Sequence, residues 1–192
     1  MKTNRTRALI VVDVQRDFCP GGALPTRDGD KIVKPLNNVI KAFEKEKMPI
    51  IFTRDWHPKN HISFKAYGGI WPPHCVKNTP GAEFHAELYI PRGAIVVDKA
   101  TEPKQEAYSG FQGTNLASEL RTKGVKEVLI GGLATDYCVL HTALDAVGNG
   151  YRATVISDCV KGVNVKRTDS ATAFRRMSSR GVKTITSSRL AS

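Results

Sequence analysis

Short apolar runs alternate along the chain with stretches of helical periodicity. The runs are rich in β-branched residues and too short for helices, so each is expected to form a strand buried on both faces. They cover residues 8–14, 49–53, 94–97, 127–130, 153–157 and 182–186. Helical stretches lie between most of them, at residues 30–47, 114–123 and 168–180 and after Thr135. This alternation predicts an α/β fold with a doubly wound, mostly parallel six-stranded sheet and helices on both faces.

The length and cysteine content favour one intracellular domain. The 192 residues suffice for one sheet between two helical layers, and no repeat or linker divides them, so we expect residues 1–192 to form a single domain. The four cysteines lack the spacing of a disulfide framework, and the first apolar run is short and broken by Asp13, unlike a signal peptide. We therefore expect a cytoplasmic protein, and no apolar run is long enough to cross a membrane.

The chain is strongly basic, with a formal net charge of +11 at pH 7. The excess of positive charge is concentrated after residue 160. There the sequence has a single acid, Asp169, and eight basic residues: Lys161, Lys166, Arg167, Arg175, Arg176, Arg180, Lys183 and Arg189. Basic surfaces attract phosphates, but no zinc knuckle, recognition-helix pattern or aromatic-rich sheet motif accompanies these residues. The pattern favours a solvated basic face over a nucleic-acid-binding module.

Polar residues that could act in catalysis or bind a ligand follow four of the expected strands. Asp13, Asp55, Lys99 and Cys138 come just after four different apolar runs. In doubly wound sheets the carboxyl ends of the strands meet at one edge, and the ligand crevice lies where the strand order reverses. Any one of these residues could be a solvated strand end, but the four together predict one site.

Cys138 has the position of a nucleophile. The run at residues 127–130 is stopped by Gly131 and Gly132, and a helical apolar stripe follows, with Thr135 as its expected N-cap. This places Cys138 in the first helical turn, where free N–H groups and the helix dipole favour a thiolate. Asp13 is then expected to act as its base and Lys99 to lower its pKa. The alternative is that Cys138 is a small buried apolar residue.

A second group of residues has the composition of a metal site. Asp55 and His57 are two residues apart in an extended segment, so their side chains point to the same side, and His74 follows later in the chain. Two histidines and one carboxylate leave positions open for water or substrate, as in catalytic metal sites. His61 is a possible fourth ligand, and Cys75 beside His74 is a weaker candidate. The alternative is that these residues are ordinary hydrogen-bonding groups.

Six segments carry these residues in a characteristic order. They are DVQRDF around Asp13, DWHPKNHISF from Asp55, WPPHC from Trp71, GAEFH from Gly81, DKATEPKQEAYSGF from Asp98, and GGLATDYCV around Cys138. In this order and spacing they resemble the nicotinamidase/pyrazinamidase group of the isochorismatase-like hydrolases. The resemblance spans most of the chain.

The resemblance implies a role for individual residues. It makes Cys138 the nucleophile, Asp13 its general base and Lys99 the third member of the triad. It implies one divalent metal, held by Asp55, His57 and His74, with His61 at a position that ligates in only some relatives. Zinc is the expected ion, with iron and manganese as alternatives.

The resemblance also implies how the substrate is held. Phe18 and Trp71 would sandwich a pyridine ring, with Leu133 and Ala134 also contacting the substrate. The amide nitrogens of Ala134 and Cys138 would form the oxyanion hole. A cis peptide is expected between Leu133 and Ala134.

The implied function is hydrolysis of nicotinamide, and of pyrazinamide, to the acid and ammonia through a thioester, in NAD salvage. The substrate is a small molecule, and a homo-oligomer is compatible with the sequence. An alternative is a metal-independent amidase of the same superfamily that cleaves carbamoyl or ureido compounds, but such relatives lack the Asp-x-His pair and the later histidine. An isochorismatase would need neither Cys138 nor this metal group. The non-haem iron oxygenases place a histidine before the acid, the reverse of the order here.

Overall fold

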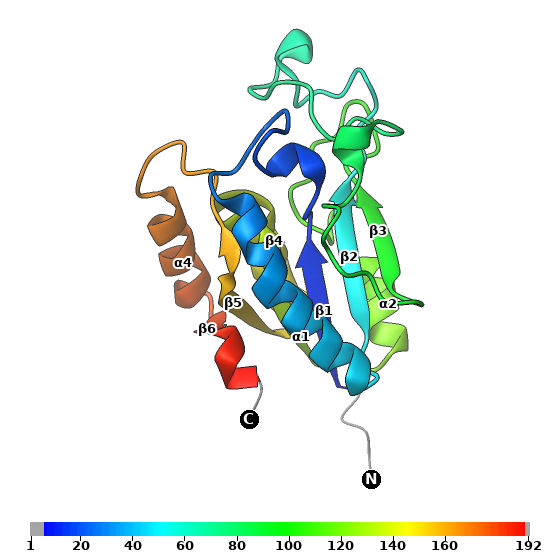
Figure 1. Cartoon of the computed structure of the whole chain (residues 1–192), viewed down its shortest axis with the longest axis vertical. Helices are drawn as coiled ribbons and strands as arrows, with labels where there is room; N and C mark the ends of the chain where they lie inside the picture. The colour runs from blue at the N-terminus through cyan, green and yellow to red at the C-terminus, as the bar shows by residue number, and fades with distance from the viewer. Residues whose placement is uncertain (1–5, 191–192) are drawn as a thin grey trace.

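The computed structural model describes residues 6–190 and is built on one six-stranded sheet (Figure 1). Its strands are β1 (Arg7–Val12), β2 (Ile50–Asp55), β3 (Ile95–Lys99), β4 (Glu127–Leu133), β5 (Arg152–Lys161) and β6 (Lys183–Ile185). All neighbouring strands are parallel, in the order β3-β2-β1-β4-β5-β6. The predicted doubly wound fold is thus confirmed, and its strand order reverses between β1 and β4.

Helices cover both faces of the sheet. They are α1 (Val33–Lys45), α2 (Leu116–Thr122), α3 (Leu140–Gly148) and α4 (Asp169–Ser179). Alternate residues of β1 point to opposite faces. Leu9 and Val11 therefore pack with α1, whereas Ala8, Ile10 and Val12 pack in a second core with α2, α3 and α4. Among the described residues, no helix is both long and apolar enough to span a membrane.

The predicted end of the fourth strand was wrong. Gly131 and Gly132 do not stop it, because β4 continues to Leu133. Gly132 has a φ of 127°, and a Cβ built there would lie 2.0 Å from the Val12 carbonyl oxygen. Glycine is thus required for the close approach of β4 to β1, and not for chain termination.

The segment around Cys138 also differs from the prediction. Residues Thr135–Val139 form one π-helical turn before α3, and the residue that precedes this turn is Ala134, whose carbonyl accepts hydrogen bonds from the N–H groups of Tyr137 and Val139. Thr135 is therefore not the N-cap. Single π-turns of this kind are frequent at functional sites.

Candidate functional site

The site lies beyond the carboxyl ends of the paired central strands β1 and β4, where the strand order reverses. Asp13 follows β1, Lys99 ends β3 and Cys138 lies in the π-helical turn after β4. The Lys99 ammonium is 3.0 Å from Asp13 Oδ2 and 3.5 Å from Cys138 Sγ. The structure thus brings together three residues that are far apart in sequence, and all three are buried.

The backbone and a neighbouring threonine orient Asp13. Its φ is 47°, so the chain turns sharply away from the sheet after Val12. Its N–H donates to the Thr53 carbonyl at 3.1 Å, and Thr53 Oγ1 donates to Asp13 Oδ1 at 2.6 Å. The other carboxylate oxygen, Oδ2, is left to face Lys99.

Lys99 is shared between two carboxylates. Its ammonium also donates to Asp55 Oδ1 and to the Ala107 carbonyl, the latter at 3.1 Å. Burial disfavours the ammonium, but Asp13 and Asp55 outweigh it and hold the pKa of Lys99 well above its usual range. Lys99 is therefore charged at neutral pH.

Burial dominates the titration of the other two members of the group. It raises the pKa of Asp13 despite the opposing effect of Lys99. It also raises the pKa of the Cys138 thiol well above its ordinary value, and Asp13 and Asp55 add to the effect while Lys99 opposes it. The expected lowering of the Cys138 pKa by Lys99 is therefore outweighed by burial, and the thiol needs the predicted base, Asp13, to take its proton.

The structure brings together Asp55, His57 and His74, the three residues predicted to hold a metal. Their ligand atoms all lie within 4.8 Å of one another, and the three side chains are buried. His57 Nδ1 lies 3.3 Å from the Ala100 carbonyl and His74 Nδ1 lies 2.8 Å from the Pro72 carbonyl. These contacts orient the rings and leave each Nε2 as the available ligand atom.

The donor set fits a divalent ion. His57 Nε2 is buried, has no hydrogen-bond partner among residues 6–190 and lies 3.5 Å from Asp55 Oδ2. Burial lowers the pKa of His74 to about 4, so its imidazole is neutral and able to ligate at neutral pH. Burial opposes ionisation of Asp55, but Lys99 and His57 lower the pKa of this carboxyl below its usual range. Two imidazoles and one carboxylate match the ligand set of catalytic zinc.

His61 lies beside this group but is held by other contacts. Its ring centroid is 4.2 Å from that of His57. Its Nδ1 is 2.7 Å from Ser63 Oγ, and its Nε2 is 3.0 Å from the Gln105 carbonyl. As a fourth ligand, His61 would have to give up one of these bonds.

Asp13, Asp55 and Cys138 also bring their ligand atoms within 4.8 Å of one another. The Lys99 ammonium contacts all three side chains, so a cation already occupies the centre of this second group.

A small cavity opens onto Cys138. Ten residues line it: Phe18, Leu24, Asp55, Trp71, His74, Tyr108, Ala134, Tyr137, Cys138 and Val163. The predicted substrate residues Phe18, Trp71 and Ala134 are among them. Leu133 is not, because its side chain packs in the α1-side core with Leu9 and Leu36. The peptide bond between Leu133 and Ala134 is cis, as expected.

Two tyrosines of this cavity were missed by the sequence analysis. Tyr108 accepts a hydrogen bond from Trp71 Nε1 at 3.0 Å, and burial raises the pKa of Tyr108 to about 12, which keeps its hydroxyl protonated. Tyr137 packs edge-on against Trp71 with ring centroids 5.1 Å apart. Tyr108 and Tyr137 lie in two of the quoted motifs, but no spacing rule connects them to Trp71.

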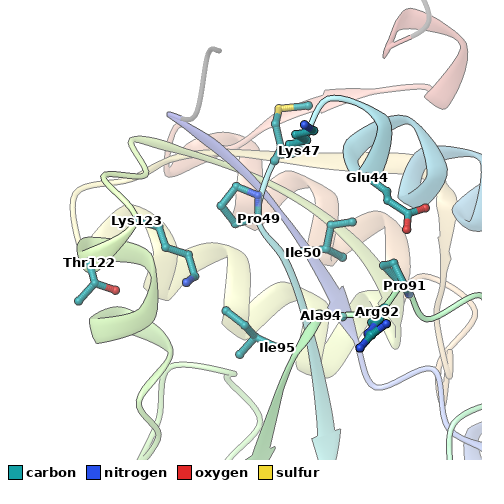
Figure 2. A pocket seen from close by; sticks show the side chains of 12 residues that line it. Glu44, Lys47, Pro49, Ile50, Pro91, Arg92, Ala94, Ile95, Thr122 and Lys123 are labelled. Atoms are coloured by element: carbon teal, nitrogen blue, oxygen red, sulfur yellow. The ribbon is translucent and has the colours of Figure 1, made fainter. Parts of the chain in front are cut away.

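A larger cavity, of about 540 Å³, lies at the opposite end of the sheet (Figure 2). It is bounded by the end of α1, the start of β2 and the end of α2, and its charged lining residues are Glu44, Lys47, Arg92 and Lys123. It shares no lining residue with the Cys138 cavity and contains no cysteine or histidine. The chemistry of the chain is therefore assigned to the smaller cavity.

Comparison with known proteins agrees with this geometry. A family model described as the isochorismatase domain matches residues 7–189. The nicotinamidase of Escherichia coli (strain K12) is 40% identical over 196 residues, covering 91% of this chain and 92% of that protein. The nicotinamidase/pyrazinamidase of Mycobacterium tuberculosis (strain ATCC 25618 / H37Rv) is 40% identical over 181 residues, covering 90% and 96%. The crystal structure of the pyrazinamidase of Pyrococcus horikoshii in complex with zinc matches with a TM-score of 0.90 at 53% identity, over 94% of this chain and 99% of that chain.

Proposed function

The chain belongs to the isochorismatase domain family, and we propose that within it the chain is a nicotinamidase that also accepts pyrazinamide, releasing the carboxylic acid and ammonia. The observation that carries the proposal is the position of the Lys99 ammonium, 3.0 Å from Asp13 Oδ2 and 3.5 Å from Cys138 Sγ. This arrangement supplies a nucleophile, a base and a fixed positive charge in one buried group. The names of the relatives support the choice of substrate.

In the first half of the proposed reaction Cys138 is acylated. Asp13 takes the proton of the thiol as sulfur attacks the carboxamide carbon, and Lys99 stabilises the negative charge that forms on sulfur. The amide nitrogens of Ala134 and Cys138 receive the oxyanion. The C–N bond then breaks, Asp13 returns the proton to the leaving nitrogen, and ammonia departs from a thioester on Cys138.

In the second half the thioester is hydrolysed. Asp13, again a carboxylate, takes a proton from water as the water oxygen attacks the thioester carbon. The C–S bond breaks, the sulfur regains its proton from Asp13, and the acid is released. The raised pKa of Asp13 suits this shuttling, since a base must hold the proton briefly and return it.

Substrate orientation is proposed to come from the cavity walls and the metal-ligand group. Phe18 and Trp71 would hold the two faces of the pyridine ring. Asp55, His57 and His74 would hold a divalent ion, and we propose zinc from their composition and from the zinc-bound relative. When bound, such an ion supplies an electron-pair acceptor for the ring nitrogen. The proposal places this activity in NAD salvage in the cytoplasm.

Ammonia release from nicotinamide by the purified, reduced, zinc-loaded protein tests the proposal. Turnover is expected in the wild type and not in Cys138→Ala, whose ligand binding should be nearly intact. Release of ammonia from a carbamoyl or ureido compound but not from nicotinamide would reject the nicotinamidase and favour the alternative amidase. Equal turnover in wild type and Cys138→Ala would reject the cysteine mechanism.

A further inference from the structure

Gln15 is a fully buried polar residue to which the mechanism gives no role. Its side-chain amide makes three hydrogen bonds to the main chain. Nε2 donates to the Asp55 carbonyl at 2.8 Å and to the Ala82 carbonyl at 2.9 Å, and Oε1 accepts from the Asp55 N–H at 2.8 Å. Both donors of the amide and its acceptor oxygen are therefore used.

The sheet explains why Asp55 needs this partner. β1 pairs with β2 as far as Val12 and Thr53, and the chain then turns away at Asp13. β2 continues for two residues to Asp55, which pairs with Lys99 of β3 on its other side. On the side that β1 has left, the Gln15 amide takes the place of a backbone peptide and bonds both the N–H and the carbonyl of Asp55.

Asp55 connects the triad to the metal-ligand group. Its Oδ1 accepts a hydrogen bond from the Lys99 ammonium, and its Oδ2 lies 3.5 Å from His57 Nε2. The direction of this carboxylate follows from the orientation of the Asp55 backbone. A rotation of that peptide would move the carboxylate relative to both the triad and the metal-ligand group.

We propose that Gln15 is a positioning residue that fixes the Asp55 backbone, and thereby aims the Asp55 carboxylate between Lys99 and the bound metal. The inference rests on the proposed function only in taking Asp55 as a metal ligand. The bond to the Ala82 carbonyl extends the same support to the turn Pro80–Ala82.

The side-chain chemistry required at position 15 is narrow. Asparagine carries the same amide on a side chain one methylene shorter, so it cannot reach both Asp55 groups from the same backbone. Methionine has nearly the length of glutamine but neither donates nor accepts as an amide does. Gln15→Asn therefore tests the length of the side chain, and Gln15→Met tests its capacity for hydrogen bonding.

The test measures zinc affinity and does not depend on nicotinamide turnover. Metal-free wild type, Gln15→Met and Gln15→Asn are titrated with zinc in competition with a chromophoric chelator, and with cobalt(II) while its visible absorption is followed. Weaker zinc binding, by about 10- to 100-fold, is expected in both variants, because residues that orient metal ligands contribute at that level. A changed cobalt spectrum is expected as the signature of a displaced carboxylate.

Val14→Ala is the matched control for a loss of stability alone. Val14 is adjacent, equally buried and apolar, and its side chain makes no hydrogen bond. It should lower the free energy of unfolding while leaving zinc affinity and the cobalt spectrum unchanged. If a Gln15 variant that folds binds zinc within twofold of the wild type, or if Val14→Ala weakens zinc binding as much, the inference is wrong.

Failure of this inference and failure of the proposed function give different results. Zinc binding that depends on Gln15, in a wild type that does not hydrolyse nicotinamide, would reject the function and keep the inference. Nicotinamide turnover together with a zinc affinity that does not depend on Gln15 would keep the proposed function and reject the inference.

Discussion

Thr53 Oγ1 donates a hydrogen bond to Asp13 Oδ1 at 2.6 Å, and this contact decides which carboxylate oxygen faces the site. Asp13 Oδ2 is thereby left 3.0 Å from the Lys99 ammonium. Thr53 and Asp13 are both fully buried, so no water competes for the hydrogen bond between them. We therefore expect Thr53 to act on the proposed reaction by positioning Asp13, a role that the sequence motifs do not reveal.

Replacing Thr53 by valine should lower kcat/KM about tenfold, because a buried hydrogen bond to a charged group is lost without a change of shape. The same bond lowers the pKa of Asp13 in the wild type. Its loss should therefore move the acidic limb of the pH profile of kcat/KM to higher pH, since Asp13 must be ionised to act as a base. Thr53→Ser should restore both quantities, and a profile unchanged in Thr53→Val would contradict the assignment.

Lys99→Met should destabilise the protein by about 3–5 kcal/mol as well as abolish turnover, because it leaves Asp13 and Asp55 buried without a counter-ion. Urea unfolding of the metal-free protein measures the effect. Arg54→Met is the control, since Arg54 pairs with Asp98 in a partly exposed position where ion pairs contribute about 0–1 kcal/mol. An equal loss of unfolding free energy in the two variants would contradict the expectation that burial makes the Lys99 ion pairs more important to stability than the Arg54 pair.

His57→Gln should weaken zinc binding by at least about 100-fold, whereas His61→Gln should change it by less than about threefold. The difference is expected because His57 Nε2 has no hydrogen-bond partner in the described part of the chain, while both ring nitrogens of His61 are hydrogen-bonded within the protein. Equilibrium dialysis against zinc measures both constants. A large loss in His61→Gln would establish it as the fourth ligand.

The metal-free protein should lose stability as the pH falls from about 6.5 to about 4. Burial lowers the pKa of His74 from 6.5 to about 4, so between these values the unfolded chain binds a proton that the folded chain does not. Above pH 6.5 the imidazole is neutral in both states and causes no loss; the loss is complete below pH 4, where it amounts to about 3 kcal/mol. Thermal or urea unfolding across this range should show a flatter pH dependence in His74→Gln; the wild-type slope in that variant would assign the effect to other groups.

Tyr108→Phe should raise KM about five- to tenfold with a smaller effect on kcat. The substitution removes the hydroxyl that accepts from Trp71 Nε1 and leaves a partly buried indole N–H without a partner. Trp71 would then be less firmly held as a wall of the cavity, while the triad is untouched. Steady-state kinetics with nicotinamide provides the measurement, and a fall in kcat at constant KM would place Tyr108 in the chemistry instead.

The succession of strands and helices along the chain, and the edge of the sheet at which the site forms, are determined by the sequence alone. Apolar runs of strand length, separated by helical periodicity, admit few arrangements other than a parallel sheet between helices. In such a sheet, residues that follow different strands converge at one edge, which is why the sequence alone predicts that Asp13, Asp55, Lys99 and Cys138 lie together. The histidines could be added because their number and type suit a metal.

Only the tertiary structure decided how the members of this group are held and in which protonation state they rest. Gln15, Thr53 and Tyr108 act through hydrogen bonds to residues 37 to 40 positions away, and such pairs depend on which strands are neighbours and where each one ends. The thiol of Cys138 is protonated because burial outweighs the nearby ammonium, and burial is a property of the packed molecule. Local sequence sets the periodicity of each element, but contacts between distant segments set the environment of each side chain.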